Sequence, residues 1–480
     1  MKKSTLAASI IAILGAAWAG GAWFTGKLAE SEFERQIAQL NNNALAQGTN
    51  MVVQIQDAKL TRGVFSSDVA YNLMLKLQPD EPALVIPMQG KLYHGPLPLD
   101  RLSHFDLVPA MFSSQMDVTK NAQTQPWFDA AQGANPFNVV TTVAYNGSAK
   151  GDIQAANGQA TLNKADWRWQ DLSVHYDVDK QGFGDVDYQI GKLQADFDEE
   201  ATQIAVRDAE SPLKTMAIHL EKVKGQSQIQ RTDFERLFVG KQEVMAQNLT
   251  AHYTYKERMP NVDFTIDKLN VELTSELKDQ FADYQFKFNA DKMQLNKVDF
   301  GALNWNLKAS HLDAETLSQL GVAYEQNNQR ALTKGGEKLL KNQPHFEIKP
   351  LKLSNQGGQF EGNFDLELAN GDFVKVLGGK PLSLFKTLTL TLKSDKAALT
   401  SLTSAVEQLG GTPKEDADNL AQEAMTEMID TLKPQNLLVE EESAVKSELI
   451  LENGELKLNG TVIPEKEITS LIIGALIQAD

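Results

Sequence analysis

The sequence predicts an α+β protein dominated by β-strands: an N-terminal transmembrane helix followed by an extended, curved antiparallel sheet with a few packed helices. Three observations support this fold class. Residues 4–26 form an uncharged run, apolar and polar residues alternate in many later segments, and a few segments space their apolar residues as helices do. With 480 residues, 42% of them apolar, the chain is long enough to build a large core.

The uncharged run at 4–26 is the first element. As a helix rising about 1.5 Å per residue, it is long enough to cross a bilayer core of about 30 Å. Lys2 and Lys3 precede it, and the positive-inside rule therefore places the N-terminus in the cytoplasm. We expect residues 1–27 to form a cytoplasmic stub and a single-pass anchor, with the lipid bilayer as a partner and the rest of the chain across the membrane.

A cleaved signal peptide is the alternative to this retained signal anchor. Residues 17–19, Ala-Trp-Ala, resemble a cleavage site, but apolar residues continue to Phe24, so that a cut there would fall inside the run. We therefore expect retention. Ala12, Ala16 and Gly20 stand four residues apart, a spacing that lets two helices approach closely, and dimerisation through the anchor stays open.

Residues 28–48 are expected to continue the helix as a stalk. Leu28, Phe33, Ile37 and Leu40 lie near one helical face, with charged residues elsewhere. This apolar stripe packs either on the body of the protein or on a second copy of the chain.

Strand patterns then dominate residues 49–310, and they return within a second β-rich region at 311–480. Alternating segments predict strands at 69–77, 139–145, 172–178, 186–190, 216–220, 249–255, 262–266, 269–273, 284–290, 303–309, 360–368, 384–392 and 449–458. Asn453 and Gly454 interrupt the last segment, and their tolerance of positive φ predicts a two-residue hairpin turn. Many strands joined by short polar turns predict an antiparallel meander.

Three longer helices are expected at 313–341, 414–433 and 465–478, and two short ones at 102–112 and 126–132. Asp313 can cap the first amides of a helix that begins at Ala314. The Gly335-Gly336 pair is expected to interrupt that helix. The C-terminal helix carries an apolar face that would dock on the sheet, on a partner or on the membrane surface.

Composition excludes several classes of function. The formal charge of −17, without a basic cluster, opposes binding to nucleic acid. The chain has no cysteine, which excludes disulfides, thiol nucleophiles and zinc–thiolate sites. An exported chain without cysteine suits an oxidising compartment such as the periplasm.

The sequence offers no motif for catalysis, metal binding or cofactor binding. None of the seven histidines has the spacing of a metal-binding pair, and neither a phosphate-binding loop nor a nucleophile elbow is present. The acidic pair Glu199-Glu200 and the run 440–442 are interpreted as solvated edges. We therefore expect a protein that is not an enzyme and needs no cofactor.

Aromatic residues share faces of several expected strands. Trp167 and Trp169 point to one side of a strand, as do Tyr284, Phe286 and Phe288. These residues form an ordinary core if helices cover that face. If the face is open, a concave apolar sheet can hold acyl chains.

Two short motifs point to a known family. Thr61-Arg62-Gly63-Val64-Phe65-Ser66-Ser67, followed by Tyr93-His94-Gly95-Pro96-Leu97, resembles the R-G-x-F-S-S and H-G-P signatures of the YdgA/YihF type of bacterial envelope proteins. The N-terminal anchor, Leu312-Asp313-Ala314 and the segment 454–460 are similar to that family too. The resemblance extends over nearly the whole chain.

The resemblance implies a periplasmic protein tethered to the inner membrane, of unassigned biochemical function, with a homodimer as one expectation. It brings no catalytic residues. The candidate interaction or structural residues are those of the two motifs: Arg62, Gly63, Phe65, His94, Gly95 and Pro96. Gly63 and Gly95-Pro96 are first interpreted as turn formers beside strands. A shared interaction surface is the alternative.

We therefore expect a non-enzymatic envelope protein, anchored in the bacterial inner membrane with its bulk in the periplasm. It would act through self-association, as a homo-oligomer, or through an envelope partner. The alternative function is binding or transport of lipid, or of another hydrophobic ligand, along a concave β-sheet.

Overall fold

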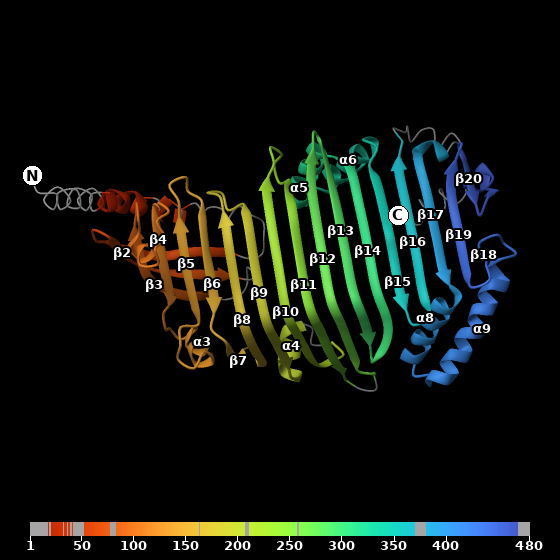
Figure 1. Cartoon of the computed structure of the whole chain (residues 1–480), viewed down its shortest axis with the longest axis horizontal. Coiled ribbons are helices and arrows are strands. Elements are labelled where there is room, and N and C mark those ends of the chain that lie inside the picture. The colour runs from red at the N-terminus through yellow and green to blue at the C-terminus, as the bar shows by residue number, and fades with distance from the viewer. Residues whose placement is uncertain are drawn as a thin grey trace, which may run out of the picture. The chain divides into compact units, whose positions relative to one another are not determined.

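The structure of the protein is a computed structural model that describes residues 18, 21–31, 33–35, 37, 38, 41, 52–76, 83–162, 164–206, 211–256, 259–369 and 381–468 (Figure 1). The chain divides into two compact units. Unit 1 comprises residues 1–196 with 226–228, and unit 2 comprises residues 197–225 with 229–480. Both are rich in antiparallel strands, which confirms the β-dominated fold class.

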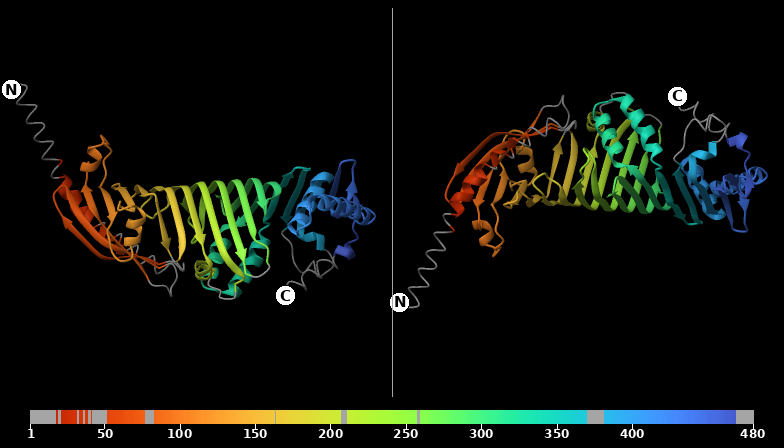
Figure 2. Two further views of the ribbon diagram at one scale, coloured as in Figure 1. Left: turned by 90° about the horizontal axis from the view of Figure 1, so that it is seen from below. Right: turned by 90° about the horizontal axis from the view of Figure 1, so that it is seen from above.

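Unit 1 is an antiparallel meander with a helix against it. Its elements are the N-terminal helix (described at residues 18, 21–31, 33–35, 37, 38 and 41), β1 Val52–Arg62, β2 Ser66–Lys76, β3 Leu84–His94, α2 Leu99–Leu102, β4 Phe112–Val118, α3 Gln125–Ala130, β5 Phe137–Val143, β6 Ala149–Ala155, β7 Gly158–Leu162, β8 Ala165–Val178 and β9 Gly184–Phe197. Consecutive strands pair from β1 to β6. β6 and β7 both pair with β8, and β8 pairs with β9. Figure 2 shows the N-terminal helix in red beside the first strands.

The core of unit 1 lies on the face where the expected alternation of β2 places its apolar residues. Tyr71 pairs with Met88 and Leu73 with Ile86. These residues pack with others from β4 and β5, and Ala29 of the N-terminal helix belongs to the same cluster. The N-terminal helix therefore covers part of the apolar face of this sheet.

Unit 2 is a second antiparallel meander, built from long strands and two helical hairpins. Its elements are α4 Glu199–Val206, β10 Leu213–Arg231, β11 Phe238–Tyr255, β12 Val262–Lys278, β13 Phe281–Leu295, β14 Val298–Asp313, α5 Ala314–Glu325, α6 Gln329–Lys341, β15 His345–Asn355, β16 Gly358–Leu368, the 3-10 helix η1 Pro381–Leu384, β17 Phe385–Asp395, α8 Lys396–Leu409, α9 Lys414–Leu432, β18 Val439–Glu440, β19 Ala444–Glu452, β20 Glu455–Leu458 and β21 Thr461–Val462. Consecutive strands pair from β11 to β17, and β17 pairs with β19. The strands β10 to β17 stand side by side and bend along their length (Figure 1).

The structure confirms three features that short sequence patterns predict: a helix cap, a hairpin turn and a helix. Asp313 accepts a hydrogen bond from the Thr316 amide (2.8 Å), as a helix cap does. Asn453 and Gly454 have φ of 54° and 81° between β19 and β20, which confirms the expected two-residue turn. α9 spans Lys414–Leu432, inside the range 414–433.

Several expected elements differ from the structure. The segments 262–266 and 269–273 belong to one strand, β12, because Lys268 takes a φ of 50° and shifts the alternation without ending the strand. The prediction of a helix at 102–112 is wrong, since the helix at this place, α2, ends at Leu102. The chain then turns where Arg101 binds Asp106 (2.5 Å).

The helix expected at 313–341 breaks earlier than its glycines suggest. α6 runs through Gly335 and Gly336. The break lies at residues 326–328 instead, where Asn327 takes a φ of 51° and the Asn328 side chain caps α6. α8 was not expected, because its apolar residues are interspersed with serine and threonine.

Most of the expected anchor, residues 1–27, lies outside the described residues, as do residues 469–478 of the C-terminal helix expected at 465–478. Within the described part of the chain, we find no helix whose length and apolar content would allow it to traverse a bilayer. The expected stalk is helical at its described positions. The boundary expected between residues 310 and 311 falls within β14.

Candidate functional site

The N-terminal helix presents a face of small residues to the sheet of unit 1. Ala22, Thr25, Gly26 and Ala29 are buried, at the three- and four-residue spacing of one helical face. Trp23, Phe24 and Leu28 lie on the other side and are exposed. Because the inner face is almost free of side-chain volume, the helix backbone approaches the sheet closely.

His94 marks the point of closest approach. A Cβ added to Gly26 would fall 2.5 Å from Cε1 and Nδ1 of the imidazole, so only glycine fits there. His94 is 1% exposed. Its Nδ1 lies 3.1 Å from the carbonyl oxygen of Val64, and its Nε2 lies 2.8 Å from Oγ of Ser67.

These contacts define the state of the His94 ring. A carbonyl oxygen can only accept, so Nδ1 carries the proton and donates to Val64, while Nε2 accepts from the Ser67 hydroxyl. Burial lowers the pKa of His94 below its ordinary value, which favours this neutral form. Both ring nitrogens therefore form hydrogen bonds within the fold.

The loop after His94 continues along the helix. The Thr25 hydroxyl donates to the carbonyl oxygen of Gly95 (2.5 Å). An added Cβ at Gly21 would come within 3.0 Å of Pro96 Cδ, and the indole Nε1 of Trp18 donates to the carbonyl oxygen of Leu97 (3.2 Å). Gly95 itself has no room for a side chain, because a Cβ would lie 1.9 Å from the Ala110 carbonyl oxygen.

The first motif holds the same helix from the turn between β1 and β2. The rings of Phe65 and Trp18 stack, with centroids 4.8 Å apart. The Arg62 guanidinium lies 5.8 Å from the centre of the Trp23 ring, and its Nη1 lies 3.2 Å from a carboxylate oxygen of Glu30.

Five of the six candidate residues thus meet the N-terminal helix: Arg62, Phe65, His94, Gly95 and Pro96. Gly63 shapes the turn that carries two of them, since its amide donates to the Ser66 carbonyl oxygen (2.8 Å). The five residues, with Ser67 and Leu97, are the helix socket. The sequence did not predict that the two motifs contact the N-terminal helix. Trp18, Thr25 and Gly26, which stand seven and one residues apart on one helical face, are the residues that could have indicated this contact.

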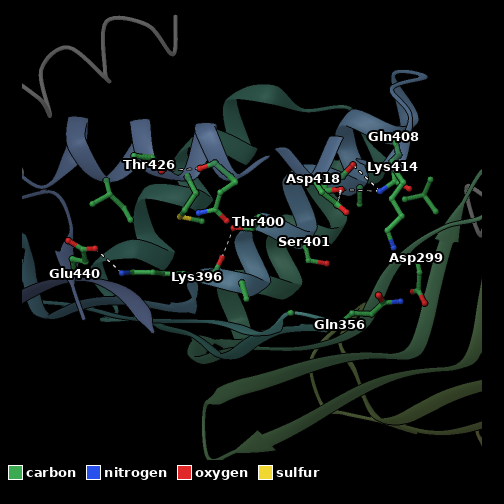
Figure 3. Close-up of a pocket in the computed structure, with 18 of the residues that line it drawn as sticks. Asp299, Gln356, Lys396, Thr400, Ser401, Gln408, Lys414, Asp418, Thr426 and Glu440 are labelled. Carbon is green, nitrogen blue, oxygen red and sulfur yellow. Dashed lines mark hydrogen bonds and ion pairs between the residues drawn. The ribbon is translucent and has the colours of Figure 1, made fainter. Parts of the chain in front are cut away.

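A polar groove of about 960 Å³ lies in unit 2 between the α8–α9 hairpin and the ends of the neighbouring strands (Figure 3). Its polar residues largely satisfy one another. Ser404 Oγ donates to Asp418 (2.5 Å), and Lys396 Nζ lies 2.7 Å from Glu440. Hydrogen bonds from Lys396 and Lys433 lower the pKa of Glu440 to about 2, so it stays ionised. The paired side chains along this groove therefore hold α8 against α9 and against β18.

One group of described residues has the composition of a metal site. His345 and Glu347 of β15 and Asp365 of β16 offer ligand atoms within 4.8 Å of one another. His345 Nε2 lies 2.9 Å from Asp365, however, and the Lys308 ammonium lies 3.7 Å from Glu347. That ammonium group already supplies a positive charge beside the carboxylate and opposes a metal ion there.

The sheet of unit 2 has two chemically different faces. On one face Lys287 and Lys241 pair with Glu272 at 2.7 and 3.0 Å, and Gln285 bonds Asn306. The other face is apolar over neighbouring strands. Its cross-strand pairs include Leu273 with Phe286, Phe288 with Trp305, and Leu307 with Ile348.

This apolar face is incompletely covered. Leu273 is 39% exposed at the middle of its strand, and Phe286, Phe288 and Trp305 are partly exposed. Phe286 and Trp305 meet edge to face at 5.6 Å. The indole Nε1 of Trp305 is buried and has no hydrogen-bond partner among the residues that the structure describes.

Comparison with known proteins supports the resemblance inferred from the motifs. A model of the DUF945 family, described as a bacterial protein of unknown function, matches residues 1–466. An uncharacterised protein of Haemophilus influenzae is 28% identical over 334 residues, covering 67% of this chain and 85% of the relative. No solved structure matches the chain.

Two proteins of Escherichia coli K12 match nearly end to end. Protein YdgA is 24% identical over 500 residues, covering 96% of this chain and 94% of its own length. The uncharacterised protein YihF is 21% identical over 501 residues, covering 97% and 98%. The expected kinship with the YdgA/YihF type is confirmed.

Proposed function

The chain belongs to the DUF945 family of bacterial proteins of unknown function, and from that premise we propose that it is a non-enzymatic envelope protein. In this proposal a single N-terminal helix anchors it in the inner membrane, and its two β-rich units lie in the periplasm. It acts by associating with a second copy or with another envelope component.

The helix socket is the observation that carries the proposal. The residues of both signature motifs contact the helix that continues from the uncharged run 4–26. A stacked ring pair, two hydrogen bonds to loop carbonyls and the close Gly26–His94 contact hold it there. Such a joint transmits the position of the anchor to unit 1, whereas a flexible linker would let the body rotate freely.

The exposed side of the same helix supports association. Trp23, Phe24 and Leu28 are exposed although they are large and apolar. Neighbouring exposed apolar side chains favour contact with another apolar surface. A second copy of this chain offers such a surface in the same membrane.

Two measurements test the anchored topology. Alkaline carbonate should leave the mature protein in the membrane fraction, and a C-terminal reporter should be active only in the periplasm. Release by carbonate, or activity only in the cytosol, would overturn the proposal.

Crosslinking tests the association. Because the natural chain has no cysteine, a single Phe24→Cys substitution gives disulfide dimers only through that position. Gln181→Cys, in the exposed turn between β8 and β9, is the matched control. We expect dimers from Phe24→Cys alone. If neither variant yields a dimer and chemical crosslinking captures no specific partner, the association fails.

Lipid binding is the second candidate function, and the open apolar face of unit 2 favours it. Leu273, Phe286 and Trp305 contribute to an apolar surface that remains partly exposed. An acyl chain would cover this surface and remove its apolar side chains from water.

Mass spectrometry of organic extracts tests this function. Protein purified in detergent should carry lipid in a fixed ratio. Leu273→Glu should lose it, because a carboxylate on the apolar face disfavours an acyl chain. Thr274→Glu points to the opposite face and should keep it. Protein that is reproducibly free of lipid would exclude this candidate.

A further inference from the structure

A short loop of unit 1 projects from the end of the helix socket. We name residues 98–109 the prong. Its base is closed by two backbone hydrogen bonds, from the Ala110 amide to Pro96 (3.0 Å) and from the Gly95 amide to Met111 (2.8 Å). The prong therefore emerges directly from the H-G-P motif.

The arginine of the prong is paired with a carboxylate of the same loop. Arg101 is 8% exposed, although arginine is normally a surface residue. Its Nε and Nη2 donate to one carboxylate oxygen of Asp106 at 3.0 and 2.5 Å, and its Nη1 donates to the carbonyl oxygen of Val108 (2.8 Å). Asp100 accepts a hydrogen bond from Ser113. Arg101 thus closes the loop and neutralises Asp106, while Asp100 is bound by a hydroxyl group outside the loop.

The outside of the prong is apolar. Phe105 is 90% exposed, Leu107 64% and Val108 61%, and Leu99 is exposed as well. Phe105 also has a φ of 58°, a conformation that a bulky side chain rarely adopts. Four large apolar side chains on one short loop are unusual for a surface that faces only water.

The contacts of residues 94–97 fix the place where the prong starts. Along this segment, successive residues meet the helix at Gly26, Thr25, Gly21 and Trp18. The segment that leads into the prong therefore runs towards the N-terminal end of the helix. Trp18 lies inside the uncharged run 4–26, so the prong begins beside a residue of that run.

We infer that the prong inserts into the lipid bilayer beside the anchor, as a second membrane contact. The inference rests on the proposed anchoring. A run of about twenty residues is needed to cross the bilayer core, and counted from Ser4 such a run ends near Trp23. If the anchor spans the bilayer, Trp18 therefore lies inside its outer leaflet, within about one to two helical turns of the interface. The prong starts at that level and presents apolar side chains around an internally paired arginine. Aromatic and aliphatic side chains on such a loop enter the interfacial region of lipid.

Depth-dependent fluorescence quenching tests this inference. The full chain, which has no natural cysteine, is reconstituted into vesicles of phosphatidylethanolamine and phosphatidylglycerol. A polarity-sensitive fluorophore is attached to Phe105→Cys, Ala12→Cys or Ala122→Cys. Ala122 is exposed beside the Val85 end of β3, about 30 Å along the strand from His94. Phe105 is so exposed that its replacement should leave the fold intact, which thermal unfolding verifies.

We expect spin-labelled lipids to quench the fluorophore at residues 105 and 12 and to leave residue 122 unquenched. Quenching at residue 12 alone would overturn the prong insertion while keeping the anchor. Quenching at neither position would overturn the anchor as well. A fluorophore at residue 105 that is shielded from aqueous quencher but unquenched by lipid would also overturn the inference, and would assign the prong to a protein contact.

Discussion

Gly26 lies directly against the imidazole of His94, with no space for even a methyl group between them. The two residues belong to the N-terminal helix and to the end of β3. Their contact joins the segment that follows the expected anchor to the core sheet of unit 1. Substituting either residue tests the contribution of this contact.

Gly26→Ala should weaken the seating of the helix. Alanine would favour the helix itself by about 1 kcal/mol, but the added carbon would lie 2.5 Å from the ring. The resulting shift should cost about 1–3 kcal/mol. We expect a lower unfolding temperature and faster hydrogen exchange in segment 62–67.

Gly336→Ala is the matched control, since residue 336 is also helical and an added Cβ there meets no atom within 4 Å. It should leave stability unchanged or raise it. Equal destabilisation by both substitutions would contradict the role assigned to the Gly26–His94 contact.

His94 should make stability depend on pH. Because burial lowers its pKa in the folded protein, the unfolded chain takes up the proton at a higher pH than the folded one. The stabilisation is complete above about pH 6.5 and is lost as the pH falls from there through the folded pKa. Thermal unfolding between pH 8 and pH 5 measures it.

Replacing His94 with glutamine, which does not titrate, should flatten this pH dependence. Glutamine retains one donor and one acceptor for Val64 and Ser67. If His94→Gln retained the full slope, another group would be responsible.

Thr25→Val should loosen the contact between the helix and the Gly95 loop. The substitution removes a buried hydroxyl donor to the Gly95 carbonyl oxygen, and we expect a loss of about 1–2 kcal/mol in the free energy of unfolding. Ser31→Ala is the control on the same helix, because its hydroxyl donates to the Leu28 carbonyl oxygen at the exposed surface. Chemical denaturation of both variants should separate them; similar losses would contradict the prediction.

Arg101→Met should open the prong. The apolar stem remains, but Asp106 and the Val108 carbonyl lose their shared donor. Limited proteolysis should then cut within 98–109. Arg168→Met removes an exposed ion pair to Asp196, and such pairs contribute little, so its cleavage pattern should match that of the natural chain. An unchanged pattern for Arg101→Met would show that other contacts hold the loop.

The strands of both units were largely predictable because a sheet with one drier face leaves a period of two in the sequence. Segment 69–77 and the Asn453-Gly454 turn are examples, since both depend on neighbours close in the chain. The broken helix at 313–341 was harder, because Gly335 and Gly336 suggested the wrong site for the break. Tertiary packing tolerates them, and Gly335 leaves room for Leu320.

By itself, the sequence determined the β-rich class, the two signature motifs and the uncharged N-terminal run, since each of these features depends only on residues that are close together in the chain. The tertiary structure alone decided what the motifs contact. Alternation tells which side of a strand is apolar, but it does not tell which distant segment covers that side. His94 acquires its tautomer and its lowered pKa from Val64, Ser67 and the bare backbone of Gly26, residues that meet only when the chain folds.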